Sequence, residues 1–318
     1  MQALWLEQGK ISYRQDIDLP SYQEHEALVR VLLAGICATD LQLIQGYYPF
    51  TGILGHEFVG EIVQAPFKPE WIGQRVVGEI NMSCGHCSQC LAQRSSHCVN
   101  RHVLGIKQHH GAFADYLVLP LKNLHCVPDN VKNEEAVFTE PFAAALEIQH
   151  QYHVKPTDKV LIIGAGRLGQ LIAQTLALTG CDLQVVARYA KQQALLQSQH
   201  INWILESEIQ HYYYDLIIEA TGSQSGFQTA INAIRPQGTI ILKSTYKGDI
   251  KVNFSQIVVN EIQILGSRCG AFLPALNLLK QKKLKLEKLI DTHYSLSQGI
   301  DALTQARQKG MMKVLLSP

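Results

Sequence analysis

The sequence KVLIIGAGRLG occupies residues 159–169 and decides the fold. An apolar run typical of a buried strand enters three glycines, Gly164, Gly166 and Gly169, and a helical pattern follows. A GxGxxG spacing alone is weak, but between a strand and a helix it is typical of a dinucleotide-binding βαβ unit. The glycines permit a tight turn, close approach of a pyrophosphate and close helix packing. A strand–turn–helix with convenient glycines is the alternative.

Strands and helices alternate on both sides of this stretch. Near-continuous apolar strands separated by helices predict a parallel, doubly wound sheet covered on both faces. We expect strands at residues 159–163, 182–187, 203–205, 215–220, 238–243 and 262–266, and helices at 170–178, 191–199 and 226–234. Residues 134–152 also have helical spacing, interrupted by Pro141.

The end of the second strand bears on which dinucleotide fits. A site for NAD places Asp or Glu there, but this sequence has Ala187-Arg-Tyr-Ala-Lys191. Arg188 could pair with a 2′-phosphate, and Lys191 could add positive charge. The sequence therefore favours NADP(H). The alternative is a solvated arginine in a NAD(H) site that lacks its acid.

The first third of the chain has short apolar runs broken by Gly and Pro, which predicts a compact, mostly-β domain. Three polar residues stand out in and just after it: Cys37 after an apolar run, His56 after Gly55, and Glu140 before Pro141. Cys, His and Glu are ligands from which a zinc site with one open position is built. Taken alone, Cys37 would more simply be a core residue and Glu140 a surface or helix-capping acid.

Four of the eight cysteines fall within fifteen residues: Cys84, Cys87, Cys90 and Cys98. Four thiolates at this spacing can wrap one tetrahedral ion in a closed site that stabilises a small lobe, at about residues 81–102. An iron–sulfur cluster is the alternative. His86 and His97 are interpreted as solvent-facing.

Composition excludes several classes. A net charge of +1 with 17% charged residues offers no basic surface for nucleic acid. No apolar run approaches the ~20 residues of a membrane span, and the N-terminus does not have the pattern of a secretory signal. We therefore expect a cytoplasmic protein, where clustered cysteines bind metal instead of forming disulfides.

With these parts in order, the chain resembles the zinc-dependent medium-chain alcohol dehydrogenases along essentially its whole length. The resemblance rests on spaced motifs, namely 35–40 (GICATD), 55–60 (GHEFVG), the cysteine quartet, 219–222 (EATG) and 235–238 (RPQG). Glu140-Pro141 resembles the polyol-dehydrogenase-like branch, in which a Glu takes the third metal position.

This resemblance implies a GroES-like catalytic domain, residues 1–140 and 271–318, and a Rossmann domain, residues 141–270. It implies a catalytic zinc on Cys37, His56 and Glu140, and a structural zinc on the four cysteines. Thr221 would contact the cofactor together with the glycine-rich residues Gly164, Gly166, Arg167, Leu168 and Gly169. Family members are usually dimers or tetramers, so a homo-oligomer is expected.

The resemblance also implies roles in a hydride transfer between NADP(H) and an alcohol or polyol, or the matching aldehyde or ketone. Thr39 would hydrogen-bond the substrate oxygen, Asp40 would orient His56, and Glu57 would lie beside the metal as a transient ligand. The active site is expected in the cleft between the two domains. The family often has a histidine at position 42, but this chain has Gln42. A proton relay ending at that residue is therefore not expected.

Three other functions stay open at this stage. A catalytically silent nucleotide-binding protein would be expected to have a damaged metal triad, whereas all three residues are present. A zinc-independent quinone or enoyl reductase lacks both ligand sets. An NAD(H)-preferring dehydrogenase differs only at the adenosine end. The substrate cannot be derived from the sequence, although Tyr47, Tyr48 and Phe50 are candidates to line its pocket.

Overall fold

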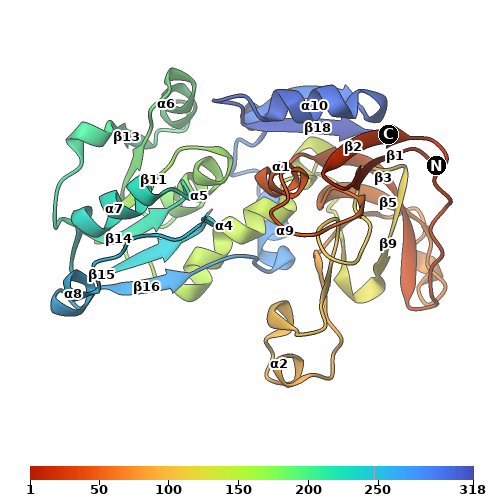
Figure 1. Ribbon diagram of the computed structural model, residues 1–318, viewed down its shortest axis with the longest axis horizontal. Coiled ribbons are helices and arrows are strands. Elements are labelled where there is room, and N and C mark those ends of the chain that lie inside the picture. Colours follow the sequence, from red (N-terminus) through yellow and green to blue (C-terminus); the bar gives the residue numbers. More distant parts are fainter. Residues whose placement is uncertain (247) are drawn as a thin grey trace. The chain divides into compact units, whose positions relative to one another are not determined.

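The computed structural model describes residues 1–246 and 248–318. It divides into two compact units, one built from Met1–Glu140 with Ala271–Pro318 and the other from Pro141–Gly270 (Figure 1). The first unit is mostly β and the second alternates strand and helix. The predicted fold class, a mostly-β domain with a doubly wound parallel-sheet domain, is confirmed.

The first unit is built around a seven-stranded sheet whose central strand is β3 (Glu26–Gly35). Strand β3 pairs antiparallel with β5 (Glu57–Gln64), with β9 (Tyr116–Pro120) and with β18 (Lys313–Ser317). The remaining strands of this sheet are β6 (Arg75–Gly78), β10 (Leu124–Cys126) and β17 (Ile290–Ser295). A second sheet joins β1 (Ala3–Glu7), β2 (Lys10–Arg14) and β4 (Gly52–Ile53).

Short helices complete this unit. Helix α1 follows β3, and α9 and α10 come from the C-terminal part of the chain (Figure 1). The bounds are α1 (Ala38–Ile44), α2 (Ser88–Leu91), α3 (Asn133–Ala136), α9 (Phe272–Lys280) and α10 (Gly299–Ala306).

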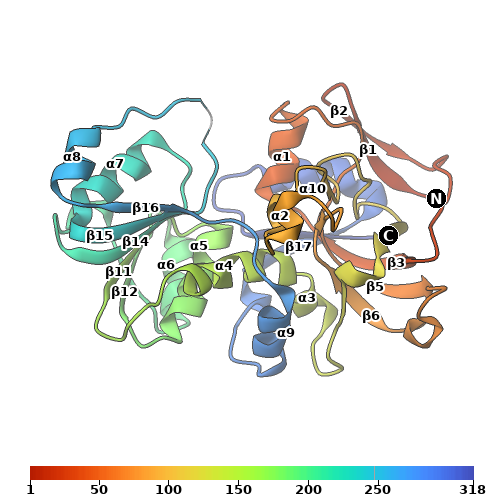
Figure 2. The same cartoon turned by 90° about the horizontal axis from the view of Figure 1, so that it is seen from below.

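The second unit is a six-stranded parallel sheet in the order β13-β12-β11-β14-β15-β16. Its strands are β11 (Lys159–Ile163), β12 (Asp182–Val186), β13 (Asn202–Ile204), β14 (Tyr214–Glu219), β15 (Ile234–Leu242) and β16 (Gln263–Gly266). The order reverses at β11. Because parallel crossovers are right-handed, the helices on the two sides of that reversal lie on opposite faces of the sheet. Figure 2 shows α5 and α6 on one face and α7 and α8 on the other.

The bounds of these helices are α5 (Arg167–Ala177), α6 (Ala190–Gln197), α7 (Gln224–Ala233) and α8 (Phe254–Val259). A further helix, α4 (Thr139–Gln151), spans the residues at which the chain passes from the first unit to the second. Pro141 is its third residue and does not interrupt it. A proline in the first turn is tolerated because its missing N–H would have no acceptor within the helix.

Asp215 joins three strands of the parallel sheet. Its carboxylate accepts hydrogen bonds from the backbone N–H of Lys159 at 2.8 Å and from Nε of Arg235 at 2.6 Å. Burial raises the pKa of Asp215, but these donors and the positive charge of Arg235 outweigh it and leave that pKa below its ordinary value. The ionised carboxylate therefore stabilises the fold.

Candidate active site and coenzyme pocket

Cys37 lies where the central strand ends and a helix begins. It is the residue before α1, and its extended backbone leaves its N–H outside the helix. The carboxylate of Asp40, three residues on, accepts a hydrogen bond from this N–H at 2.8 Å. This capping bond fixes the turn after β3 and with it the position of the thiol.

Asp40 also holds His56. The second oxygen of its carboxylate lies 3.2 Å from Nδ1 of His56, and both side chains are buried. Burial lowers the pKa of His56, but the Asp40 carboxylate and Cys37 outweigh it and hold that pKa well above its ordinary value. The bond at Nδ1 leaves Nε2 of the ring to bind a metal ion.

A three-residue donor cluster results. One possible ligand atom each from Cys37, His56 and Glu57 lies within 4.8 Å of the others. Thiolate, imidazole and carboxylate donors at this separation suit a zinc ion with room for another ligand. Thr39 is adjacent, with its hydroxyl 3.8 Å from Sγ of Cys37.

Glu140, the residue predicted as the third ligand, is half-buried in the first turn of α4. It does not belong to the donor cluster found among the residues that the structure describes. Its role as a ligand therefore stays a prediction. In the donor cluster, the carboxylate beside Cys37 and His56 is that of Glu57.

Glu57 has a cationic partner that the sequence did not reveal. The ammonium group of Lys313, on β18, forms an ion pair with its carboxylate. Both residues are almost fully buried, at 3% exposure for Lys313 and 1% for Glu57. The only sequence signal was a lysine at the start of the apolar run 313–316.

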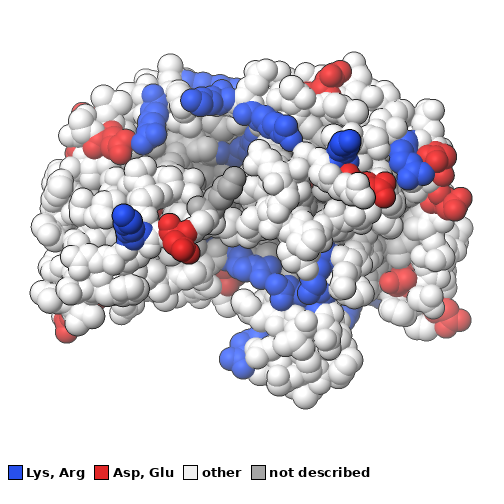
Figure 3. Space-filling model, in the orientation of Figure 1, with Lys and Arg blue, Asp and Glu red and all other residues white. Residues whose placement is uncertain are grey.

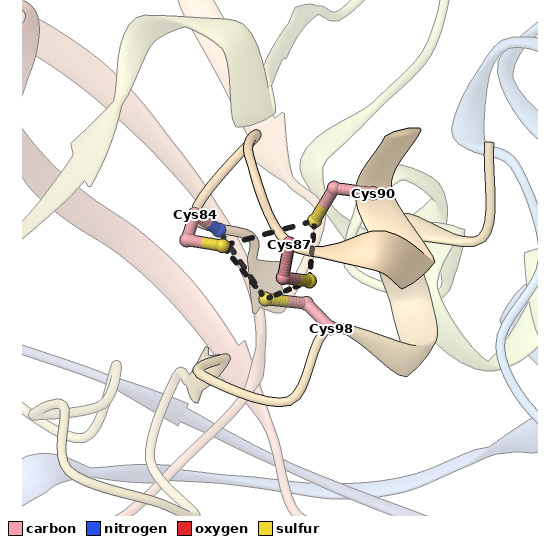
Figure 4. A group of neighbouring side chains, drawn as sticks. All are labelled: Cys84, Cys87, Cys90 and Cys98. Atoms are coloured by element: carbon pink, nitrogen blue, oxygen red, sulfur yellow. Dashed lines mark hydrogen bonds between the residues drawn. The ribbon is translucent and has the colours of Figure 1, made fainter. Parts of the chain in front are cut away.

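The four clustered cysteines form a second candidate metal site (Figure 4). Four of the six pairs of Sγ atoms are separated by 3.5 to 4.0 Å, and all lie within 4.8 Å of one another. A tetrahedral ion with Zn–S bonds of about 2.3 Å requires separations of about 3.8 Å between its sulfurs, so the quartet fits zinc closely. The backbone of His86 donates to the Cys84 thiolate and lowers its pKa to about 6, whereas desolvation raises the pKa of Cys90 to about 11.

The lobe that carries these cysteines has little other structure. A two-stranded pair, β7 (Asn81–Met82) with β8 (His102–Val103), closes its base, and α2 lies near its tip (Figure 1). A closed four-thiolate site would supply much of the folding free energy of such a lobe.

A cavity of about 290 Å³ lies in the second unit, beside the glycine-rich turn. Gly164 has a φ of +108°, which only glycine adopts readily. A Cβ on Gly166 would meet no atom within 4 Å, so the space above it is open to a ligand. Gly166 is also the residue before α5, whose first N–H groups and dipole favour an anion. This arrangement fits a dinucleotide pyrophosphate.

Residues of four loops line this cavity. They are Ile163, Gly164, Ala165, Gly166, Val186, Arg188, Tyr189, Gln192, Glu206, Ala220, Thr221, Ser223 and Gly226. Four of the predicted cofactor residues are among them: Gly164, Gly166, Arg188 and Thr221. The other four, Arg167, Leu168, Gly169 and Lys191, are not among the described lining residues and lie in the first turns of α5 and α6.

The position of Thr221 is set by a buried carboxylate. Glu219, at the end of β14, is fully buried and accepts hydrogen bonds from the backbone N–H of Thr221 at 2.8 Å and from the hydroxyl of Tyr246. Burial and the Glu219 carboxylate raise the pKa of Tyr246, so its hydroxyl stays a donor. These bonds hold the loop that closes one side of the cavity.

The part of the cavity that follows β12 and β13 contains an ion pair. Nη2 of Arg188 lies 2.8 Å from Oε2 of Glu206. Sequence reasoning singled out Arg188 but missed Glu206, because the two residues are brought together only by the pairing of neighbouring strands. Tyr189, Gln192 and Ser223 also line the cavity and were not predicted.

One face of the molecule carries charged side chains of both signs. Figure 3 shows basic and acidic side chains interspersed on the face that it draws, with large areas that carry neither. Within residues 1–246 and 248–318, none of the helices has the length and apolar character needed to cross a membrane.

Comparison with known proteins identifies the family. The model of the alcohol dehydrogenase GroES-like domain matches residues 23–129, and the model of the zinc-binding dehydrogenase matches residues 168–281. The sorbitol dehydrogenase of Halalkalibacterium halodurans is 30% identical over 94% of this chain and 93% of its own length. The chain belongs to the zinc-binding alcohol dehydrogenase family.

Solved structures of related dehydrogenases agree with this assignment. A zinc-binding dehydrogenase of Sinorhizobium meliloti 1021, solved with NADP, superposes with a TM-score of 0.92 at 27% identity and covers 100% of this chain and 99% of its own. An alcohol dehydrogenase of Escherichia coli CFT073, solved with NADH, has a TM-score of 0.91 at 28% identity, with the same coverage. The predicted class, a zinc-dependent oxidoreductase of alcohol or carbonyl substrates that uses a nicotinamide coenzyme, is confirmed.

Proposed function

We propose that this dehydrogenase oxidises a polyol or other secondary alcohol, or reduces the matching ketone, with NADP(H) as its favoured coenzyme. The donor cluster at Cys37 and His56 carries the proposal, because a buried carboxylate, Asp40, fixes both residues at once. The polyol class is suggested by Glu140-Pro141 and by similarity to a sorbitol dehydrogenase.

Two zinc ions per chain are part of the proposal. Cys37 and His56 would hold the catalytic ion together with Glu140, and Glu57 would exchange with it as a transient ligand. Cys84, Cys87, Cys90 and Cys98 would hold the structural ion. When bound, the catalytic ion would act as a Lewis acid on the substrate oxygen, and the nicotinamide would carry the hydride.

The chain's own residues would orient the reactants. Asp40 holds the ring of His56 in one orientation. Thr39, whose hydroxyl lies 3.8 Å from Sγ of Cys37, would hydrogen-bond the substrate oxygen. Because Gln42 does not titrate, the proton from Thr39 would leave through a coenzyme ribose hydroxyl or water.

The preference for NADP(H) rests on Arg188. Its guanidinium lines the cavity at the end of β12, and this loop has no Asp or Glu to accept from both ribose hydroxyls of NAD(H). A planar guanidinium binds a phosphate through two parallel hydrogen bonds. Lys191 would add charge in the same loop.

An activity screen with NADP+ and NAD+ over polyols, secondary alcohols and primary alcohols tests the proposed reaction. We expect turnover of polyols with a higher kcat/KM for NADP+. An absence of turnover with every alcohol and carbonyl compound would favour a catalytically silent nucleotide-binding protein, and a preference for NAD+ would refute the role of Arg188.

Metal analysis tests the ligand assignment. We expect two zinc ions per chain in the parent and one in Glu140→Ala. The Glu57→Gln variant, in which the neighbouring carboxylate is neutralised, should keep both. If Glu57→Gln instead lost one zinc ion and Glu140→Ala kept both, Glu57 would be the third ligand and Glu140 the transient one.

Two further features belong to this proposal. Metal-binding thiolates require a reducing compartment, which fits the cytoplasm. By similarity to the family, we expect a homo-dimer or homo-tetramer, which light scattering would show.

A further inference from the structure

We propose that Glu206 is a coenzyme-specificity residue that weakens binding of a 2′-phosphorylated dinucleotide by competing with that phosphate for Arg188. This inference rests on the proposed binding of NADP(H) in the cavity of the second unit. It concerns a residue that follows β13, whereas Arg188 follows β12.

The sheet brings the two residues together. Strands β12 and β13 are parallel neighbours, and the backbone N–H of Ala187 donates to the carbonyl of Ile204 at 3.1 Å, just beyond the ladder. The residues that follow two neighbouring parallel strands meet at the same edge of the sheet. Arg188 and Glu206 therefore face each other there, with Nη2 and Oε2 2.8 Å apart, and both line the same cavity.

The charges of these groups oppose each other toward a 2′-phosphate. Arg188 attracts the phosphate, whereas the Glu206 carboxylate already accepts a hydrogen bond from the guanidinium and repels a second anion. An arriving phosphate must either displace Glu206 or share the guanidinium with it. A 2′-hydroxyl, as in NAD(H), carries no charge and can donate to a carboxylate, so it meets no such penalty.

Exposure limits the strength of this competition. The side chains of Arg188 and Glu206 are 63% and 46% exposed, so water screens the ion pair strongly. The pair therefore adjusts the affinity for the phosphate without blocking the site. The size of the effect should be that of an exposed ion pair together with a screened repulsion, about three- to tenfold in affinity.

The backbone under Arg188 is held independently of Glu206. Oε1 of Gln192 accepts hydrogen bonds from the backbone N–H groups of Arg188 at 3.2 Å and Tyr189 at 3.3 Å. Removing the charge of Glu206 should therefore free the side chain of Arg188 and leave its loop in place. The substitution Glu206→Gln is suited to this purpose because it keeps the size of the side chain.

The experiment measures binding of adenosine 2′,5′-bisphosphate and of 5′-AMP to the full, zinc-loaded chain by calorimetry. These two probes differ only in the 2′-phosphate and need no turnover. In E206Q we expect about three- to tenfold tighter binding of the bisphosphate and less than a twofold change for 5′-AMP. Unchanged or weaker binding of the bisphosphate would overturn the proposal.

Glu208→Gln is the matched control. Glu208 belongs to the same short helix, and its carboxylate accepts from the backbone N–H of Leu205 at 2.7 Å. It is not among the described residues that line the cavity. E208Q removes the same charge, so an equal effect in the two variants would reduce Glu206 to a general electrostatic contribution and overturn the proposal.

A second background separates competition for Arg188 from simple repulsion. In Arg188→Ala, the effect of E206Q on the bisphosphate should shrink, because no guanidinium remains to be released. An undiminished effect would refute the competition. Failure of the proposed preference for NADP(H) would give a different result, because the parent chain would then bind the bisphosphate and 5′-AMP equally. In that case the inference about Glu206 would hold only if E206Q bound the bisphosphate more tightly than 5′-AMP.

Discussion

Replacing Lys313 by methionine should destabilise the first unit far more than the same replacement of an exposed lysine. Methionine keeps much of the length and the apolar contacts of the lysine stem but removes its charge. The carboxylate of Glu57, at 1% exposure, would then lie buried without its cationic partner. Breaking a buried ion pair in this way costs about 3–5 kcal/mol of unfolding free energy, because the remaining charge keeps its desolvation penalty.

The structure supplies two controls for this prediction. Lys132→Met breaks an ion pair to Glu287 whose side chains are 67% and 57% exposed, and it should leave the free energy of unfolding nearly unchanged because water screens the pair. The double variant Lys313→Met/Glu57→Gln removes both buried charges and should recover most of the loss, because no uncompensated charge remains.

Urea unfolding followed by circular dichroism gives the free energies, and hydrogen exchange of β5 and β18 assigns the change to the first unit. Tryptophan fluorescence would mix the two units, since Trp5 and Trp71 lie in one and Trp203 in the other. An uncompensated buried charge is excluded as the cause if Lys313→Met costs no more unfolding free energy than Lys132→Met, or if the double variant is as unstable as the single one.

Three other changes test separate parts of the structure. Asp215→Asn should cost about 1–2 kcal/mol of unfolding free energy at pH 7. Because the folded-state pKa of Asp215 is lowered, the stability difference between variant and parent in urea unfolding should shrink as the pH falls below about 4. An equal difference at pH 7 and pH 3.5 would contradict the role of the ionised carboxylate. Cys90→Ser should remove one zinc ion and make residues 81–102 sensitive to protease, whereas the exposed Cys126→Ser should change neither. Asp40→Asn should weaken zinc binding at the catalytic site about 10–100-fold in a chelator competition. The exposed Asp16→Asn should leave this affinity unchanged. Equal zinc affinities of the parent and Asp40→Asn would show that the Asp40 carboxylate does not orient His56 for metal binding.

The parallel sheet could be predicted well because its strands are buried on both faces. Such strands are near-continuous apolar runs bounded by glycine or polar residues, so their positions are visible in the sequence. The bounds of the last strands were predicted less accurately. Strand β15 begins at Ile234, four residues before the predicted start, because its first residues pair beside an irregularity opposite β14.

Whether a contact of the candidate site could be predicted depends on how far apart its residues are in the sequence. The capping contact between Cys37 and Asp40 is local, and the cysteine quartet spans fifteen residues, so both patterns are visible in the sequence. The ion pair of Glu57 with Lys313 joins residues 256 positions apart. The hydrophobic periodicity of the sequence cannot predict such a pair, because the contact depends on which strands become neighbours in the sheet.

The cavity of the second unit shows the same limit over a shorter separation in sequence. Arg188 was visible as a basic residue at the end of a predicted strand. Glu206 lies 18 positions further on, beyond a helix and another strand, and its relevance depends on the order of strands in the sheet. A motif at one strand end therefore describes only part of the chemistry at that edge.

The discontinuity of the first unit has a consequence for synthesis of the chain. Its strand β3 pairs with β18 (Lys313–Ser317), which comes after the second unit in the sequence. The second unit, residues 141–270, is contiguous and is complete in the nascent chain before β18 exists. Until residues 313–317 are translated, the end of β3 at Ala34 and Gly35 lacks its native partner β18, and an unpaired strand edge invites association with other chains. Residues 313–317 therefore determine when the first unit can finish folding.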